Sequence, residues 1–233
     1  MANPEHVKLA SSGPAVFDHW RESNPDIRLD LEGADLSGVD LAGTKLRAAN
    51  LKGANLSNAK LSQANLAGAD LSGADLSEAD FGRAGMAGVD LTSATVVNVN
   101  LFWADLKGAV LKDAVLTHCR MNRVSLIGAD LSGADFSQSN MIEADLRNAN
   151  MTNARFQSTN MNGADLSRAV MPGADFHLAM IRDSMWIATD VRGASFRQAS
   201  LHRSDFTLAK WDDTTKFPDK FDPEDTGPKD VND

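Results

Sequence analysis

The sequence predicts an all-β solenoid, built as a four-sided β-helix of about nine coils. Bulky apolar residues occupy every fifth position from Leu31 to Trp211, and none of these 37 positions is polar. Each of the 36 bulky residues after Leu31 is preceded, two positions earlier, by a small residue. Of these 36 small residues, 25 are Ala. One residue type also recurs at intervals of 20, at Phe136, Phe156, Phe176 and Phe196. Four pentapeptides therefore make one coil, and like residues stack above one another.

A spacing of five residues fits neither a single helix nor a single strand. An α-helix advances roughly 100° per residue, so apolar residues five apart would spread around its surface. A strand alternates its faces, so an odd spacing would send successive apolar residues to opposite faces. The chain must therefore turn a corner in every repeat, so that the small and the bulky residue of each pentapeptide point to one common axis. At a spacing of roughly 4.8 Å per coil, nine coils give a rod about 43 Å long.

Residues 1–28 are expected to form an N-terminal cap with a short helix. Pro14 is placed to begin this helix in its first turn, and Pro25 ends it. Over residues 14–22, Phe17 and Trp20 contribute to one apolar face. Such a helix would cover the open apolar end of the first coil, because the ends of a solenoid must be shielded from water.

Residues 29–211 form the predicted β-helix, and residues 212–233 follow as a C-terminal cap and an acidic tail. The five-residue spacing ends at Trp211, and Phe217 and Phe221 are expected to fold back over the last coil. From about residue 224 the chain is polar, which is typical of disorder.

The repeat itself resembles a known family. The pentapeptide Gly-Ala-Asp-Leu-Ser occurs at residues 33–37 and again at residues 73–77. It is similar to the repeat of the pentapeptide repeat family, and the resemblance extends over about 180 of the 233 residues. The resemblance implies a right-handed quadrilateral β-helix. It also implies that the small and the bulky residue of each repeat point inward, while the Asp or Asn between them faces outward.

The composition indicates a chain that is cytoplasmic and does not cross a membrane. The formal net charge is −9 and the hydrophobic fraction is 42%. No run of 18 apolar residues is long enough to span a bilayer. The N-terminus does not have the pattern of a signal peptide. The only cysteine, Cys119, falls on an inward small position, so we interpret it as a packing residue.

The sequence predicts neither an enzyme nor a cofactor or metal site. None of the five histidines stands at metal-ligand spacing from another. No phosphate-binding loop, nucleophile elbow or dinucleotide fingerprint is present. The inward residues fill the interior, which leaves no room for a substrate cavity. We therefore expect a non-catalytic scaffold that binds another protein, as a monomer or homodimer, without binding nucleic acid directly.

One group of outward residues is the first candidate for that binding. It combines aromatic, basic and aliphatic side chains, at Arg83, Phe102, Trp103, Arg120, Arg123 and Ile142. Exposed tryptophan and arginine are enriched in protein-binding hot spots. The structural alternative is that the arginines only sandwich the Trp103 ring by cation–π contact. A second apolar cluster at Met180, Met185 and Ile187 is a candidate dimer contact, or lies under the folded-back tail.

The resemblance to this family also suggests an alternative function. Some pentapeptide repeat proteins bind DNA gyrase or topoisomerase IV as mimics of duplex DNA, and so protect the enzyme against quinolones and other poisons. Two adjacent sides of this solenoid carry a net charge of −7 and the opposite two carry +3. Duplex DNA would carry about 25 charges over such a rod, against a net −4 here. The candidate acidic faces contain Asp30, Asp35, Asp70, Asp75, Glu78, Asp90, Asp130, Asp135, Asp175 and Asp190.

Overall fold

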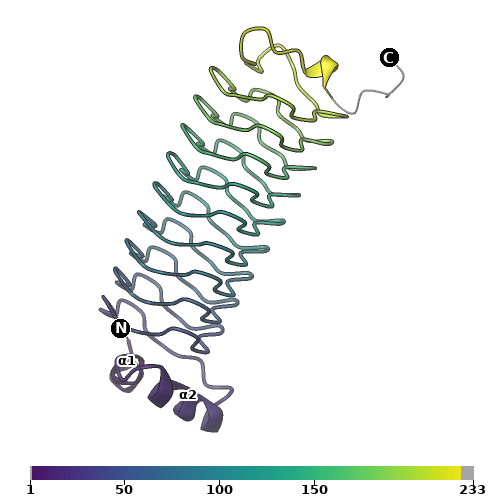
Figure 1. Ribbon diagram of the computed structural model, residues 1–233. Helices are drawn as coiled ribbons and strands as arrows, with labels where there is room; N and C mark the ends of the chain where they lie inside the picture. The colour runs from purple at the N-terminus through teal and green to yellow at the C-terminus, as the bar shows by residue number, and fades with distance from the viewer. Residues whose placement is uncertain (1, 227–233) are drawn as a thin grey trace.

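The computed structural model describes residues 2–226 and shows a long four-sided rod (Figure 1). Parallel bridges join residues that lie 20 positions apart, from Asp30 with Asn50 to Asp190 with Lys210. Each pentapeptide contributes one bridging residue, so pairing is confined to single positions separated by turns. The prediction of a solenoid is confirmed.

Each regular repeat is held by one turn and by backbone hydrogen bonds to the coils on either side. The backbone N–H of Leu31 donates to the carbonyl of Asn50 at 2.7 Å, and the N–H of Asn50 donates to Leu29 at 2.8 Å. The N–H of Ala34 closes a turn onto the carbonyl of Leu31 at 3.0 Å. Gly33 occupies the third position of that turn with a φ of 67°, a conformation that glycine adopts without strain.

The four sides of the rod are named here after their first bulky residue, as the Leu31, Leu36, Leu41 and Leu46 sides. On each side the small residue and the bulky residue of every repeat point into the core, and the bridging residue between them faces outward. A corner of two turn residues connects each side to the next. Surface residues 20 apart therefore lie in one column along the rod.

Aromatic residues of the Leu36 side form a continuous stack in the core. The rings of Phe136 and Phe156 lie 5.1 Å apart, and those of Phe156 and Phe176 lie 4.9 Å apart. The Phe196 ring continues the stack at 5.0 Å from Phe176. All of these rings are fully buried and nearly parallel. The 20-residue recurrence thus places like side chains one above another, with no cavity between them.

Polar residues at the small positions are satisfied inside the rod. The Ser139 hydroxyl donates to the carbonyl of Leu116 at 2.7 Å and accepts from the N–H of Cys119 at 2.9 Å. The Cys119 thiol is buried and donates to the carbonyl of Val96. Burial raises the pKa of this thiol to about 12. Such a thiol stays protonated at neutral pH, as the interpretation of Cys119 as a packing residue requires.

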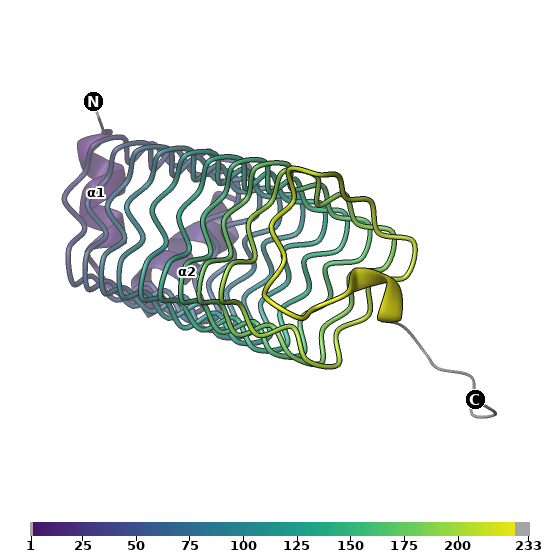
Figure 2. The same ribbon diagram turned by 90° about the horizontal axis from the view of Figure 1, so that it is seen from above.

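Two helices lie beside the first coil at the N-terminal end (Figures 1 and 2). They are α1 (Pro4–Ala10) and α2 (Pro14–Ser23). The side chain of Asn3 caps α1, and its backbone N–H donates to the carbonyl of Asp30 in the first coil at 3.1 Å. Phe17 of α2 is fully buried and belongs to the same core as the leucines of the rod. The sequence predicted a helix at α2 but not at α1.

The coil continues past Trp211 with one inserted residue. Ser195 pairs with Lys216, one position further along the chain than the regular spacing would place its partner. This places the Phe217 ring 5.5 Å from Phe196 in a parallel stack. The five-residue spacing of the sequence ends at Trp211, but the parallel pairing continues along one more side of the rod.

The remaining chain covers the last complete coil (Figure 2). The Phe221 ring packs edge to face on Phe206 at 5.4 Å. A short 3₁₀-helix, η1 (Pro223–Asp225), follows, and the hydroxyl of Thr226 accepts from the backbone N–H of Phe206 at 3.1 Å. Regular structure therefore extends into the start of the segment for which disorder was expected. The rest of that segment, residues 227–233, lies outside the described residues.

Candidate protein-interaction surface

The solenoid interior is filled, so any binding site of the rod lies on its outer surface or at its ends. The bulky inward residues from Leu31 to Phe206 are at most 3% exposed. Within residues 2–226 no group of three or more His, Cys, Asp or Glu side chains is placed to hold a metal ion. The helices of the same range are all too short and polar to span a bilayer.

Trp103 stands at a corner of the rod with half of its side chain exposed. It is the third residue of a turn that the N–H of Ala104 closes onto Leu101 at 3.0 Å. Its φ is 59°, a left-handed conformation that costs a residue with a Cβ atom about 1–2 kcal/mol. Three coils further on, the same position holds Gly163 with a φ of 71°. The fold therefore does not need a large side chain at this corner.

The neighbouring coils place an arginine on each side of the Trp103 ring. The guanidinium carbon of Arg83 lies 6.0 Å from the ring centroid, and that of Arg123 lies 5.7 Å from it. Phe102, the preceding turn residue, contacts the same ring at 6.2 Å with a tilt of 36°. The three corner residues are 20 apart and form one column. We call Arg83, Phe102, Trp103 and Arg123 the Trp103 ridge.

The column continues with an acidic residue that the sequence analysis did not include. The carboxylate of Glu143 accepts from Nε of Arg123 at 2.7 Å. Arg83, by contrast, has no ion pair within residues 2–226. Glu143 could have been found from the sequence, because it stands one coil after Arg123 and therefore falls in the same column. The two arginines that flank Trp103 are thus electrostatically different, and Arg83 carries the unneutralised charge.

Two residues predicted for this patch lie apart from the tryptophan ring. Arg120 occupies a bridging position on the flat Leu41 side, where it pairs with Asn100. Ile142 is half-buried at the corner two coils beyond Phe102, and Asn122 occupies the coil between them. Among the described residues, neither Arg120 nor Ile142 takes part in a ring contact. The compact part of the predicted patch is the Trp103 ridge.

The carboxylates of the predicted acidic faces act mainly as turn acceptors. Asp70 Oδ1 accepts from the backbone N–H of Ser72 at 2.9 Å and from its hydroxyl at 2.6 Å. Asp75 makes the same two bonds with Ser77, also at 2.9 and 2.6 Å. An Asp or Asn that bonds the backbone two residues later is a typical turn-forming arrangement. The frequent use of Asp and Asn at bridging positions is therefore explained by the turns.

Stacked Asn and Asp residues also bond between coils. Asn50 donates its amide to Asp30 Oδ1 at 3.0 Å, and Asn150 donates to Asp130 Oδ1 at the same distance. These amides lie directly above the carboxylates, because the residues are 20 apart. The acidic columns are consequently interrupted by neutral donors and do not form a continuous line of charge.

Two of these carboxylates have lowered pKa values. Hydrogen bonding from Ser37 lowers the pKa of Asp35. Arg192 lowers the pKa of Asp190 through a side-chain hydrogen bond, and its Nε and Nη2 atoms bind the two carboxylate oxygens at 2.9 and 2.6 Å. The Asp190 charge is thus ionised but paired with a cation.

The predicted apolar cluster near the C-terminal end is divided by a charged corner. Met180 lies on the Leu41 side and Met185 on the Leu46 side, with 43% and 42% exposure. Between them, Asp183 forms an ion pair with Arg203 at 2.6 Å. Met185 and Ile187 line one shallow depression of about 400 Å³. The structure therefore groups Met185 with Ile187 and separates Met180 from both.

Two exposed leucines were not singled out in the sequence. Leu178 is 50% exposed and Leu208 is 76% exposed. Both occupy the third turn position, with a φ of 60°. The signal that could have found them is a bulky residue where many repeats have glycine, as at Trp103.

Comparison with known proteins agrees with the repeat geometry. The family model for pentapeptide repeats matches in eight copies, and the matched segments include residues 28–63, 54–92, 97–133, 119–157, 129–168 and 149–184. No curated protein sequence matches the chain.

HetL and QnrB1 are two of the solved structures that match the chain. The crystal structure of HetL, a pentapeptide repeat protein involved in heterocyst differentiation regulation in the cyanobacterium Nostoc sp. strain PCC 7120, superimposes with a TM-score of 0.67. The two sequences are 28% identical over 83% of this chain and 93% of HetL. QnrB1, a plasmid-mediated fluoroquinolone resistance protein, gives a TM-score of 0.40 at 19% identity, over 75% of this chain and 90% of that one. The matched repeats extend over more than half of the sequence, and the chain therefore belongs to the pentapeptide repeat family.

Proposed function

We propose that this chain is a non-catalytic protein-interaction scaffold whose partner binds at the Trp103 ridge. In this proposal the scaffold is a right-handed rod of about nine coils, closed at its N-terminal end by the cap of residues 1–28. The filled interior supports a binding role, because it leaves the rod no enclosed substrate cavity.

An exposed tryptophan carries the proposal. Trp103 is 51% exposed, at a corner that glycine occupies three coils further on. Its left-handed φ is shared by the third turn position throughout the rod, in residues with and without a Cβ atom, so the exposed indole ring is what distinguishes this corner. The flanking arginines hold the ring in place before a partner arrives, which lowers the entropic cost of binding.

The partner surface should complement the uneven charge of the ridge. Glu143 already neutralises Arg123, whereas Arg83 is unpaired within residues 2–226. We therefore expect a partner with an apolar pocket for the indole ring and an acidic group that faces Arg83. Tryptophan and arginine side chains of this kind contribute the largest share of binding energy at protein interfaces.

The test compares two variants at equivalent turn positions. Trp103→Gly removes the indole from the ridge, and Leu178→Gly removes an apolar side chain of similar exposure and the same φ elsewhere on the rod. A pull-down from native lysate identifies proteins that bind the wild-type rod, and titration with the purified partner follows. The proposal expects Trp103→Gly to lose the partner and Leu178→Gly to keep it. Equal binding by both variants would overturn it.

The alternative function is that of a DNA mimic that binds gyrase or topoisomerase IV. The asymmetry of charge between adjacent pairs of sides favours it, at −7 against +3. Against it stand the small net charge of the solenoid and the use of the carboxylates in turns. A supercoiling assay with purified gyrase distinguishes the two functions. Inhibition of the enzyme, or protection from a quinolone, by micromolar protein would favour the mimic, and the absence of both would exclude it.

We also propose that self-association, where it occurs, uses the apolar residues near the C-terminal end. Met185 and Ile187 share one depression, and Met180 lies across the corner from them. Light scattering on the purified chain gives the mass in solution. A dimer that Met185→Lys converts to monomer would support this contact, and a dimer unchanged by the substitution would exclude it.

A further inference from the structure

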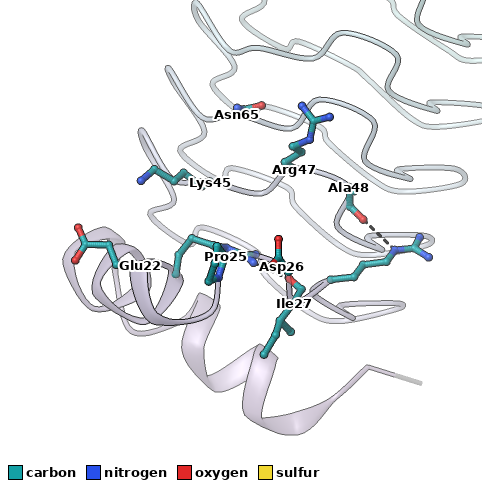
Figure 3. A pocket seen from close by; sticks show the side chains of 10 residues that line it. Glu22, Pro25, Asp26, Ile27, Lys45, Arg47, Ala48 and Asn65 are labelled. Carbon is teal, nitrogen blue, oxygen red and sulfur yellow. Dashed lines mark hydrogen bonds between the residues drawn. The ribbon is translucent and has the colours of Figure 1, made fainter.

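A groove lies between the N-terminal cap and the Leu46 side of the first coils (Figure 3). One wall is formed by the end of α2 and the segment that follows it, including Pro25 and Ile27. The other wall is formed by the first coils, including Lys45 and Arg47. The volume of the groove is about 490 Å³, within the range of pockets that take small molecules.

The residues of the groove carry an excess of positive charge in an otherwise acidic chain. Four cations line it, at Arg21, Arg28, Lys45 and Arg47. Two carboxylates line it as well, those of Glu22 and Asp26, so the formal charge of the lining is +2. The whole chain has a charge of −9. Within residues 2–226 none of the four cations forms an ion pair.

Arg21 is the most constrained of these cations. It is only 6% exposed, and its Nη1 atom donates to the backbone carbonyls of Asn24 and Ile27 at 3.1 and 2.6 Å. Its Nε and Nη2 atoms are buried and have no hydrogen-bond partner among the described residues. Buried polar groups normally have partners, and one without any costs free energy. Burial also lowers the pKa of the Arg21 guanidinium, which reflects the uncompensated cost of its charge.

Fixed contacts hold the walls of the groove in position. Arg28 donates from Nε to the carbonyl of Ala48 at 2.9 Å, which fastens the linking segment to the first coil (Figure 3). The rings of Phe17 and Trp20 lie 5.9 and 5.2 Å from the guanidinium carbon of Arg21. The Arg21 side chain, and with it the positive charge of this wall, is therefore held in place before a ligand binds.

We propose that this groove binds a phosphate group, either as free phosphate or as part of a small phosphorylated molecule. A phosphate monoester carries a charge of about −1.5 to −2 at neutral pH, which balances the +2 of the lining. Its oxygens match the planar donor fork of an arginine. Arg21 contributes its charge from one wall, and Lys45 and Arg47 contribute theirs from the opposite wall. This site is independent of the Trp103 ridge.

Calorimetric titration of the full chain at constant ionic strength tests the proposal. The probes are inorganic phosphate, glycerol 3-phosphate and acetate. We expect saturable binding of both phosphates and much weaker binding of the acetate monoanion. Tighter binding of glycerol 3-phosphate than of inorganic phosphate would identify a phosphorylated molecule as the ligand class, and the reverse order would identify free phosphate. Acetate binding as tight as phosphate, or no saturable binding of either phosphate, would overturn the proposal.

Variants connect the binding to the groove. Loss of one charge-assisted hydrogen bond weakens affinity by about tenfold, so we expect this change for Lys45→Gln and for Arg47→Gln. Both residues are exposed, so these variants should fold normally. Lys112→Gln, at an exposed lysine elsewhere on the rod, is the matched control. Equal weakening by the Lys45 and Lys112 variants would mean that only general charge is involved, which would overturn the site.

Discussion

The indole Nε1 of Trp186 donates a hydrogen bond of 2.8 Å to the hydroxyl of Ser184, two residues earlier in the same repeat. Trp186 is the only tryptophan among the fully buried inward residues of the described chain. A leucine at this position would need no partner, but an indole N–H in the core does. The small residue of this repeat is accordingly a serine instead of the usual alanine. The choice of one inward residue thus constrains the other.

Ser184→Ala is therefore expected to destabilise the rod, even though alanine is the commonest residue at small positions. The change leaves the Trp186 N–H without its acceptor and also removes the bond between the hydroxyls of Ser184 and Ser204. A buried donor without a partner costs about 1–3 kcal/mol. Urea unfolding measures the loss. Ser62→Ala, at a turn position without a side-chain hydrogen bond, should change stability little, and an equal loss in both variants would contradict the argument.

The inward and outward positions can be separated by one pair of substitutions. Ala134 is fully buried, and a leucine there would press against the adjacent coils. Overpacking of this kind costs about 1–3 kcal/mol. Gln138 is exposed with a φ of 62°, a conformation that Leu178 and Leu208 also adopt, so Gln138→Leu should change stability by less than about 0.5 kcal/mol. Thermal unfolding of both variants gives the comparison, and similar shifts would mean that the register is wrong.

The fold was predictable because one periodicity determines both packing and stacking. A bulky residue every five positions requires a corner in each repeat, and phenylalanines every 20 positions indicate how many corners make a coil. The inserted residue before Phe217 was not predictable in this way. An insertion breaks the spacing, and only the parallel stack of Phe217 on Phe196 reveals the continued coil. Helix α1 was missed because seven residues carry little periodic signal.

The surface was predictable only where it follows the same period. Arg83, Trp103 and Arg123 meet because they occupy the same corner in three successive coils. Arg120 was grouped with them by its nearness in sequence, but it lies on a flat side. The groove beside Arg21 could not be predicted, since the segment between α2 and the first coil follows no repeat.

Two substitutions of Asp75 distinguish a structural role of the acidic residues in the turns from a role of their negative charge. Asp75→Asn keeps an oxygen that can accept from the backbone N–H of Ser77, so stability should change by less than about 0.5 kcal/mol. Asp75→Ala removes that acceptor and should cost about 1 kcal/mol. Chemical denaturation of the two variants measures the difference. If Asn were as destabilising as Ala, the negative charge and not the turn would be the important feature of this residue.

The stability of the rod should not depend on Trp103. Replacement by glycine relieves a left-handed backbone conformation, worth about 1–2 kcal/mol, and loses two cation–π contacts of about 0.5–1 kcal/mol each. These effects offset each other, so the free energy of unfolding of Trp103→Gly should lie within about 1 kcal/mol of the wild type. Equilibrium unfolding is the measurement. A loss of several kcal/mol would place Trp103 among the structural residues and would remove the main support for the ridge as a binding surface.

Alkaline pH should reveal the buried thiol of Cys119. Burial raises the pKa of Cys119 in the folded state to about 12, from an ordinary value of 9.0. Between these values the unfolded chain releases the thiol proton and the folded chain retains it. Folding stability is therefore unaffected below about pH 9 and falls above it, by up to about 1.4 kcal/mol per pH unit.

Cys119→Ala should remove that fall, because alanine is the usual residue at this inward position. The chain has no tyrosine, so lysines are the main other groups that titrate in this range, and both proteins share them. Urea unfolding at intervals from pH 7 to pH 11 would give two stability curves. We expect them to run in parallel up to about pH 9 and then to differ in slope, with the wild type falling faster. Curves that stay parallel to pH 11 would show that the thiol ionises as readily in the rod as in the unfolded chain, and the close packing around Cys119 would have to be revised.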